Sequence, residues 1–167
     1  MSKQFWILLG VGLAVVAAGL GILLVGTKGN HLELDGEILH TRVMELNPNA
    51  SLVIVDFRVR NPSDVPFVVK SVTLELTPAS GQEVDGRTIS KPDLENVFQY
   101  EKLIGPKFND ALSIEDRIGP HQTTDRMAGA RFEMGESAID ARKALKLRIE
   151  DLDGTVAEIG ERSALKK

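Results

Sequence analysis

The sequence contains no cysteine among its 167 residues, so neither a disulfide framework nor a thiolate metal site can form. Aromatic residues are also scarce, at 5% of the chain, and the one tryptophan is Trp6. Proteins that bind carbohydrate or single-stranded nucleic acid usually carry more aromatic stacking surface than this. Acidic residues outnumber basic ones, and the resulting net charge of −4 provides no electrostatic basis for binding nucleic acid.

Motifs that would carry catalysis are lacking as well. His31, His40 and His121 share no spacing that would let them bind one metal ion. No serine lies in the G-x-S-x-G pattern of a nucleophile elbow. The segment Asp151–Gly154 begins like a calcium loop, but the position that needs a closing glutamate holds Arg162. We therefore expect a non-enzymatic protein with no catalytic, cofactor-binding or metal-binding residues.

The chain does contain one long apolar run without charge, Phe5–Val25. As a helix, its 21 residues would span roughly 30 Å, the thickness of the hydrocarbon core of a bilayer. A cleaved signal peptide usually has a shorter apolar region of about 7–15 residues, so we expect residues 1–28 to be a retained signal-anchor. Lys3 favours a cytoplasmic N-terminus, and Lys28 on the other side opposes it. The expected localisation is the cell membrane, single-pass, with the C-terminal domain extracytoplasmic.

Small residues recur every four positions within the run, at Gly10, Ala14 and Ala18. This spacing lets two transmembrane helices approach closely, so the three residues form a candidate face for self-association. The alternative is that glycine and alanine are simply frequent in such helices.

Strand-like alternation of apolar and polar residues follows the anchor. It extends from Leu32 to Met44, over Val53–Val59 and over Val72–Leu76, and each stretch has one apolar face. We expect these to be three half-buried strands of an antiparallel sheet. Further alternating stretches are Ser113–Ile118, Thr124–Met134 and a hairpin over Leu145–Ile159 with its turn at Asp153-Gly154.

Helical spacing replaces the alternation at residues 93–103 and at Gly135–Ala144. The first helix is amphipathic, and we expect it to lie over an open end of the sheet. The pattern predicts a mainly β fold, an antiparallel seven-stranded immunoglobulin-like β-sandwich with one or two short helices, preceded by a single transmembrane helix. The expected division is an anchor at 1–28, a sandwich at 29–160 and a polar tail at 161–167.

The helix at 93–103 also provides the best candidate for a contact surface, which we assign to Phe98, Tyr100 and Phe108. The alternative is that these aromatic side chains belong to the ordinary core.

One turn resembles a known family. A strand ending at Arg60 runs into Asn61-Pro62, and a second strand opens with apolar residues after Val65-Pro66. This arrangement is similar to that of the group-2 late-embryogenesis-abundant proteins, also described as the water-stress and hypersensitive-response (WHy) domain. The resemblance covers about residues 32–159, with Asn61 and Pro62 as its specific feature. It implies a small seven-stranded sandwich with a stress-protective or binding role and without catalytic residues.

These observations predict a membrane-anchored β-sandwich with a binding or scaffolding role in the cell envelope. Its expected partners are the membrane and either an envelope protein or a second copy joined through the anchor. Two alternatives remain open: a desiccation protectant of the late-embryogenesis-abundant type, and a carrier of an apolar ligand.

Overall fold

The computed structural model describes residues 33–161. The predicted anchor, its candidate pairing face at Gly10, Ala14 and Ala18, His31 and most of the polar tail lie outside these residues. Within 33–161, no helix has the length and apolar character needed to cross a membrane.

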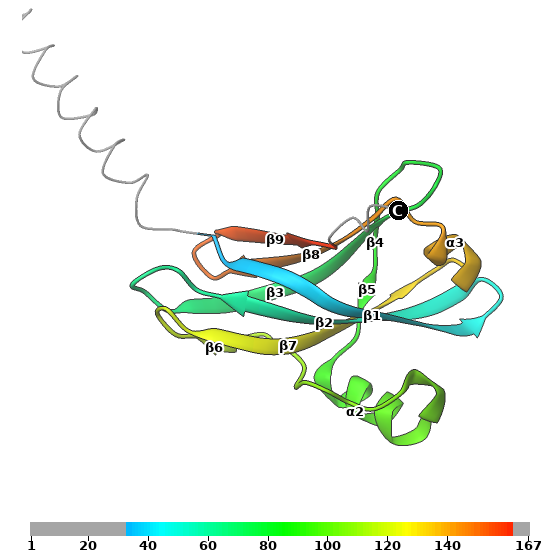
Figure 1. The fold of residues 1–167 in the computed structure, drawn as a ribbon, viewed down its shortest axis with the longest axis horizontal. Coiled ribbons are helices and arrows are strands. Elements are labelled where there is room, and N and C mark those ends of the chain that lie inside the picture. The colour runs from blue at the N-terminus through cyan, green and yellow to red at the C-terminus, as the bar shows by residue number, and fades with distance from the viewer. Residues whose placement is uncertain (1–32, 162–167) are drawn as a thin grey trace, which may run out of the picture. The chain divides into compact units, whose positions relative to one another are not determined.

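The described chain is mainly β and forms two antiparallel sheets (Figure 1). The first sheet has the order β1-β2-β7-β5. Its strands are β1 Asp35–Asn47, β2 Ala50–Arg60, β7 Thr123–Phe132 and β5 Arg87–Thr88. The second sheet has the order β4-β3-β8-β9, and β6 pairs with β3 beside it. Its strands are β4 Val84–Asp85, β3 Phe67–Thr77, β8 Ala144–Asp151, β9 Val156–Gly160 and β6 Arg117–Ile118. The predicted terminal hairpin is confirmed as β8 and β9.

The prediction that the first three long strands are neighbours in one sheet is wrong. Strand β2 lies between β1 and β7, whereas β3 pairs with β8 in the other sheet. The connection at residues 61–66 therefore crosses from one sheet to the other. Alternation predicts which face of a strand is buried, but it does not specify the neighbouring strand.

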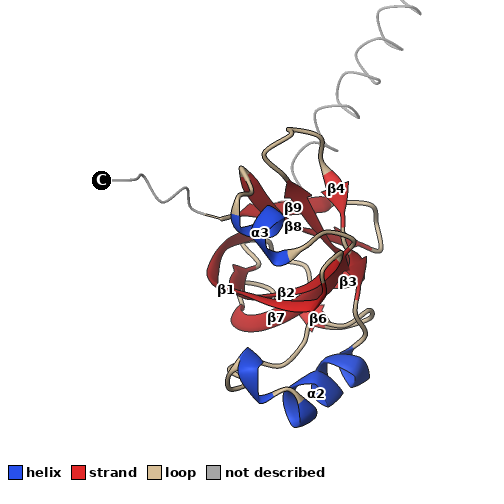
Figure 2. Ribbon diagram, turned by 90° about the vertical axis from the view of Figure 1, so that its right-hand side faces the viewer, coloured by secondary structure: helices blue, strands red, loops and turns tan. Residues whose placement is uncertain are grey.

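The main core lies between the two sheets (Figure 2). Every second residue of β2 from Val53 to Val59 is fully buried there, as the alternation predicts. Leu74 of β3 and Leu147 of β8 belong to the same cluster. Burying each such side chain contributes about 1.5–3 kcal/mol, so this interface is the main source of the fold's stability.

The first part of the outer face of β2 is also buried, which corrects the expectation that this strand is buried on one face only. Leu52 and Ile54 pack on this face with Leu94 and Ile104, in a second apolar cluster that includes Met127. Leu94 belongs to α2, Lys91–Tyr100, and Ile104 to the 3-10 helix η1, Lys102–Ile104. These two helices cover the outer face of the first sheet, not an open end as predicted (Figure 1).

Helix α2 begins two residues before the predicted start. The Ser90 hydroxyl accepts a hydrogen bond from the backbone N–H of Asp93, which caps the helix. Pro92 lies in the first turn, where its missing N–H has no partner to lose. The second predicted helix is confirmed as the short α3, Glu136–Asp140.

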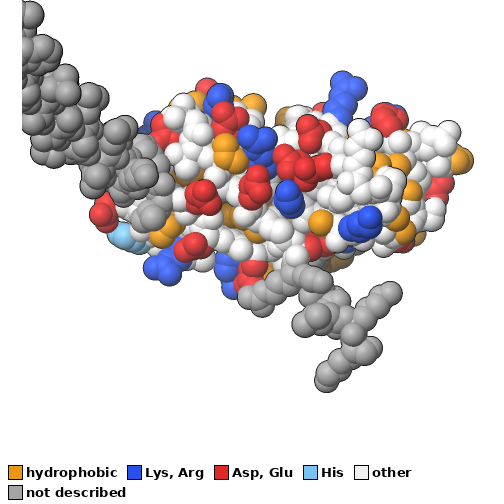
Figure 3. All heavy atoms as spheres, turned by 90° about the horizontal axis from the view of Figure 1, so that it is seen from above, with side chains coloured by type: hydrophobic (Ala, Val, Ile, Leu, Met, Phe, Trp, Pro, Cys, Tyr) orange, Lys and Arg blue, Asp and Glu red, His pale blue; other side chains and the backbone are white. Residues whose placement is uncertain are grey.

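The outer face of the second sheet carries exposed ion pairs instead of a helix. Lys70 pairs with Glu150 at 2.6 Å and Lys146 with Glu83 at 3.1 Å. Figure 3 shows acidic and basic side chains interspersed on this side of the molecule. The two sheets therefore differ on their outer faces. Helices cover the outer face of the first sheet, whereas that of the second sheet is exposed and charged.

Candidate functional site

The helical cover presents a group of exposed apolar side chains. Tyr100 is 72% exposed, Leu103 94% and Phe108 60%, all within one short segment. Three of the seven large exposed hydrophobic residues of the described chain thus lie between residues 100 and 108. We refer to Tyr100, Leu103 and Phe108 as the cap surface.

Two of the three sequence-predicted contact residues belong to this surface, and one differs. Tyr100 and Phe108 face solvent, whereas Phe98 is partly buried against the outer apolar cluster. Leu103 was missed because its helical spacing suggested a core position. Helix α2 ends at Tyr100, and the chain continues as η1, which turns Leu103 outward.

Arg42 of β1 holds the segment that carries Phe108. Its guanidinium lies over the rings of Phe98 and Phe108, 5.0 and 5.3 Å from their centroids. It also donates to the Pro106 carbonyl at 2.8 Å. His40 stacks on Phe108 with ring centroids 5.8 Å apart. These contacts hold the Phe108 ring against β1 and restrict the conformations of its side chain.

Asp56 of β2 is the buried counterpart of Arg42. The two form an ion pair at 2.6 Å, and the Asp56 side chain is 0% exposed. The second carboxylate oxygen accepts from the Asn109 amide at 2.9 Å. Both oxygens of a fully buried carboxylate are therefore occupied, which a stable buried charge requires. The Arg42–Asp56–Asn109 set connects β1, β2 and the loop after η1.

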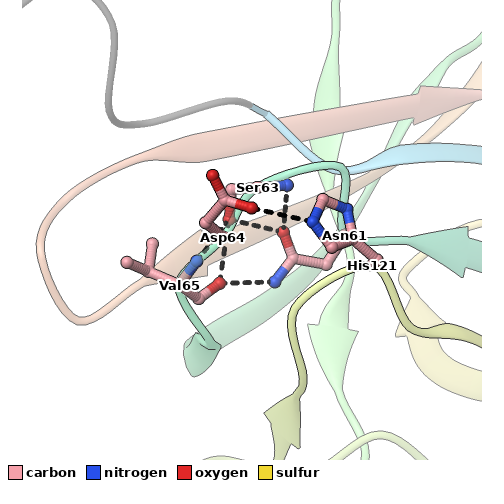
Figure 4. Close-up of polar contacts among 5 residues, drawn as sticks. All are labelled: Asn61, Ser63, Asp64, Val65 and His121. Atoms are coloured by element: carbon pink, nitrogen blue, oxygen red, sulfur yellow. Dashed lines mark hydrogen bonds and ion pairs between the residues drawn. The ribbon is translucent and has the colours of Figure 1, made fainter.

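The Asn61 turn, which carries the family resemblance, contains a buried network of hydrogen bonds (Figure 4). The Asn61 amide donates to the carbonyls of Val65 at 2.8 Å and Ile118 at 3.0 Å. Its oxygen accepts from the backbone N–H and the hydroxyl of Ser63 at 3.0 and 2.7 Å. All four hydrogen-bonding positions of the side chain are used, so Asn61 has none left for a ligand.

A solvent-exposed contact between His121 and Asp64 lies next to this network. The His121 ring nitrogen Nε2 lies 2.8 Å from Asp64 Oδ1, and both side chains are open to solvent (Figure 4). Together with Asn61, the pair connects the 61–66 loop to the loop that precedes β7. These residues hold two connections together, and the geometry assigns them a structural role.

A further ion pair of the first sheet lies between β2 and β7. Arg58 donates two hydrogen bonds to the Asp125 carboxylate, at 2.7 and 2.8 Å. These hydrogen bonds and the attraction between the charges lower the pKa of Asp125 and raise that of Arg58. The pair is solvent-exposed and crosses two strands, as expected for a pair that supports strand register.

In the described part of the chain, no group of three or more histidine, aspartate or glutamate side chains is placed to hold a metal ion. His40 is engaged with Phe108 and His121 with Asp64.

Fold and surface together define a mainly β domain of two antiparallel sheets with a helical cap on one outer face. No family model matches the chain, and neither a curated protein nor a solved structure is significantly similar to it. The resemblance at Asn61-Pro62 therefore stays a prediction.

Proposed function

We propose that this protein is a single-pass membrane protein whose β-sandwich domain lies outside the cytoplasm and binds a protein partner in the cell envelope. The binding is non-enzymatic and uses the cap surface. The observation that carries this proposal is the concentration of exposed Tyr100, Leu103 and Phe108 on a segment fixed to the sheet. Exposed apolar side chains gathered in one place are typical of interaction sites, and aromatic residues are enriched at interface centres.

The strand order supports the finer fold that we propose, an immunoglobulin-like sandwich. Such a domain has strands A, B, E and D in one sheet and C, F and G in the other. Taking β1, β2, β3, β5, β7, β8 and β9 as A to G gives this distribution, with β4 and β6 as short additions to β3. The proposed kinship with the WHy domain rests on this order and on the Asn61 turn.

A pull-down from gently solubilised membranes tests the binding role. The full chain carries a C-terminal tag, and the Leu103→Ser and Phe108→Ser variants are compared with it. Leu152→Ser is the matched control, because Leu152 is 62% exposed and lies in the β8–β9 turn instead of the cap. We expect a partner that is retained by the control and lost by both cap variants.

The proposal fails if no partner is recovered in stoichiometric amount, or if the same partner is recovered from all four proteins. Circular dichroism of each purified variant checks that the sheets are intact.

A further inference from the structure

A groove of about 500 Å³ lies between one edge of β3 and the connection from β5 into α2. Its wall is mostly apolar, and two of its residues, Val72 and Leu112, belong to the main core. Ile89 and Ile114 extend the apolar wall outward. The volume is within the range of roughly 300–1,000 Å³ that is typical of small-molecule sites.

The backbone along this edge of β3 is already occupied at several points. The Leu74 carbonyl accepts from the Gly86 N–H at 2.8 Å, and the Val72 carbonyl accepts from the Thr88 hydroxyl at 2.7 Å. Val69 exchanges backbone hydrogen bonds with residues 115 and 116. An added peptide strand would need these groups, so the edge favours a ligand that binds by apolar contact.

Two polar features stand out on the wall. Among the described residues that line the groove, Lys91 is the only charged one, in a chain with a net charge of −4. The Ser113 hydroxyl is buried and has no hydrogen-bond partner within residues 33–161. A buried hydroxyl without a partner is costly, and a polar atom of a ligand would satisfy it.

We propose that this groove binds an acyl chain that carries an anionic head group. The chain lies against Val72, Ile89 and Leu112, the head group pairs with Lys91, and the Ser113 hydroxyl donates to a ligand oxygen. This assignment locates the apolar-ligand alternative that the sequence left open. It depends on neither the cap surface nor the anchor.

Photolabelling in native membranes tests this proposal on the full chain. The probe is a long-chain fatty acid with a diazirine in its chain, and labelled peptides are mapped by mass spectrometry. We expect labels on residues 71–73, 88–92 and 112–114. Ile114→Glu places a negative charge on the apolar wall, which disfavours the acyl chain and repels the anionic head group, and we expect labelling there to fall about tenfold. Leu152→Glu is the matched control, since Leu152 and Ile114 are 62% and 67% exposed.

The pairing of the head group with Lys91 is tested by comparing an acidic probe with a neutral one. Lys91→Glu should reduce labelling by the fatty acid and leave labelling by a matching diazirine fatty alcohol unchanged. A diazirine lysophospholipid used in parallel distinguishes a free fatty acid from a membrane lipid as the source of the chain. Ser113→Ala, which keeps the groove's shape, should weaken labelling by the acid.

Labels on residues 5–25 are expected of any span that lies in lipid and do not count either way. The proposal is overturned if, within the sandwich domain, the labels miss the groove or fall mainly on the cap surface, or if Ile114→Glu and Leu152→Glu label equally. Protection of β3 by an added extended peptide, without acyl labelling of the groove, would assign the groove to a peptide instead. Thermal unfolding of each variant shows whether a loss of labelling reflects the groove or the fold.

Discussion

Asp56 illustrates what a single residue does for the cap. Its buried carboxylate receives Arg42 from β1 and Asn109 from the loop after η1. Removing one partner of a buried ion pair leaves the other charge without compensation, at a cost of about 3–5 kcal/mol. We expect Arg42→Ala to destabilise the domain by about this amount and to increase amide hydrogen exchange over residues 101–111.

Urea unfolding of the full chain in mild detergent measures the stability, and mass spectrometry measures the exchange. Lys146→Ala is the control, because Lys146 pairs with Glu83 on the exposed outer face of the second sheet. Equal effects of the two substitutions would contradict the importance of the buried pair.

Asn61 provides the second prediction. Its side chain makes four hydrogen bonds and is 1% exposed, so Asn61→Ala should cost about 3 kcal/mol. Asn61→Asp keeps the acceptor but turns an oxygen toward the carbonyls of Val65 and Ile118. Burial and these carbonyls raise the pKa of the new carboxyl, so this variant should regain stability as the pH falls. Urea midpoints at pH 7 and pH 5 test this. A loss of stability that does not depend on pH would contradict the assigned hydrogen bonds of Asn61.

The Arg58–Asp125 pair predicts a pH effect of the opposite sign. The pKa of Asp125 is lowered in the folded protein, chiefly by the hydrogen bonds from Arg58. The pair's stabilisation is complete above the unfolded pKa of about 3.9 and is lost as the pH falls through the folded value. In Arg58→Gln, the pKa of Asp125 should move back up toward its ordinary value. Carbon-detected NMR titration of this carboxyl measures the change, and an unaltered titration would contradict the assigned cause.

Among the secondary-structure elements, the docking of α2 depends on a missing side chain. A Cβ at Gly129 of β7 would lie 2.6 Å from the Cδ2 atom of Leu94. Leu94 lies on the buried side of α2, where the surrounding side chains restrict its movement. We therefore expect Gly129→Ala to cost about 1–3 kcal/mol through overpacking. The Leu94→Ala background should reduce this cost, which a double-mutant cycle measures.

Gly160 provides the control for this cycle, because a Cβ there would meet no atom of the described residues within 4 Å. If Gly160→Ala and Gly129→Ala destabilise equally, the close approach of α2 to β7 is not the cause.

The strands facing the main core could be predicted from the sequence, and the helical cover could not. Alternation over Val53–Val59 identifies one buried face of β2. The opposite face carries Asp56 and Arg58, which gave it a polar pattern. Asp56 is nevertheless buried, because Arg42 and Asn109 come from distant parts of the sequence to pair with it. Periodicity cannot report such partners, since it depends on neighbours along the chain.

The same limit applies to the cap surface. The helix predicted at residues 93–103 led us to assign the contact surface to Phe98, Tyr100 and Phe108. Their separation into one partly buried and two exposed side chains depends on where α2 ends and η1 begins. Element boundaries are the least predictable feature of a sequence, so Leu103 could not be assigned to the surface beforehand.

For the whole molecule, the proposal depends on the run Phe5–Val25 and on its orientation. A C-terminal reporter that is active only outside the cytoplasm should be active when fused to the full chain. The reporter should also remain in the membrane fraction after an alkaline wash. Release of the reporter into the wash would instead indicate a cleaved signal peptide. The orientation rests on Lys3 against Lys28, and cations near the span favour the cytoplasmic side. Lys3→Glu should therefore lower reporter activity per molecule, and Lys28→Gln should raise or preserve it. The opposite ranking would contradict the role assigned to the two lysines, and a reporter that is inactive on the full chain would place the sandwich, its cap surface and its groove in the cytoplasm.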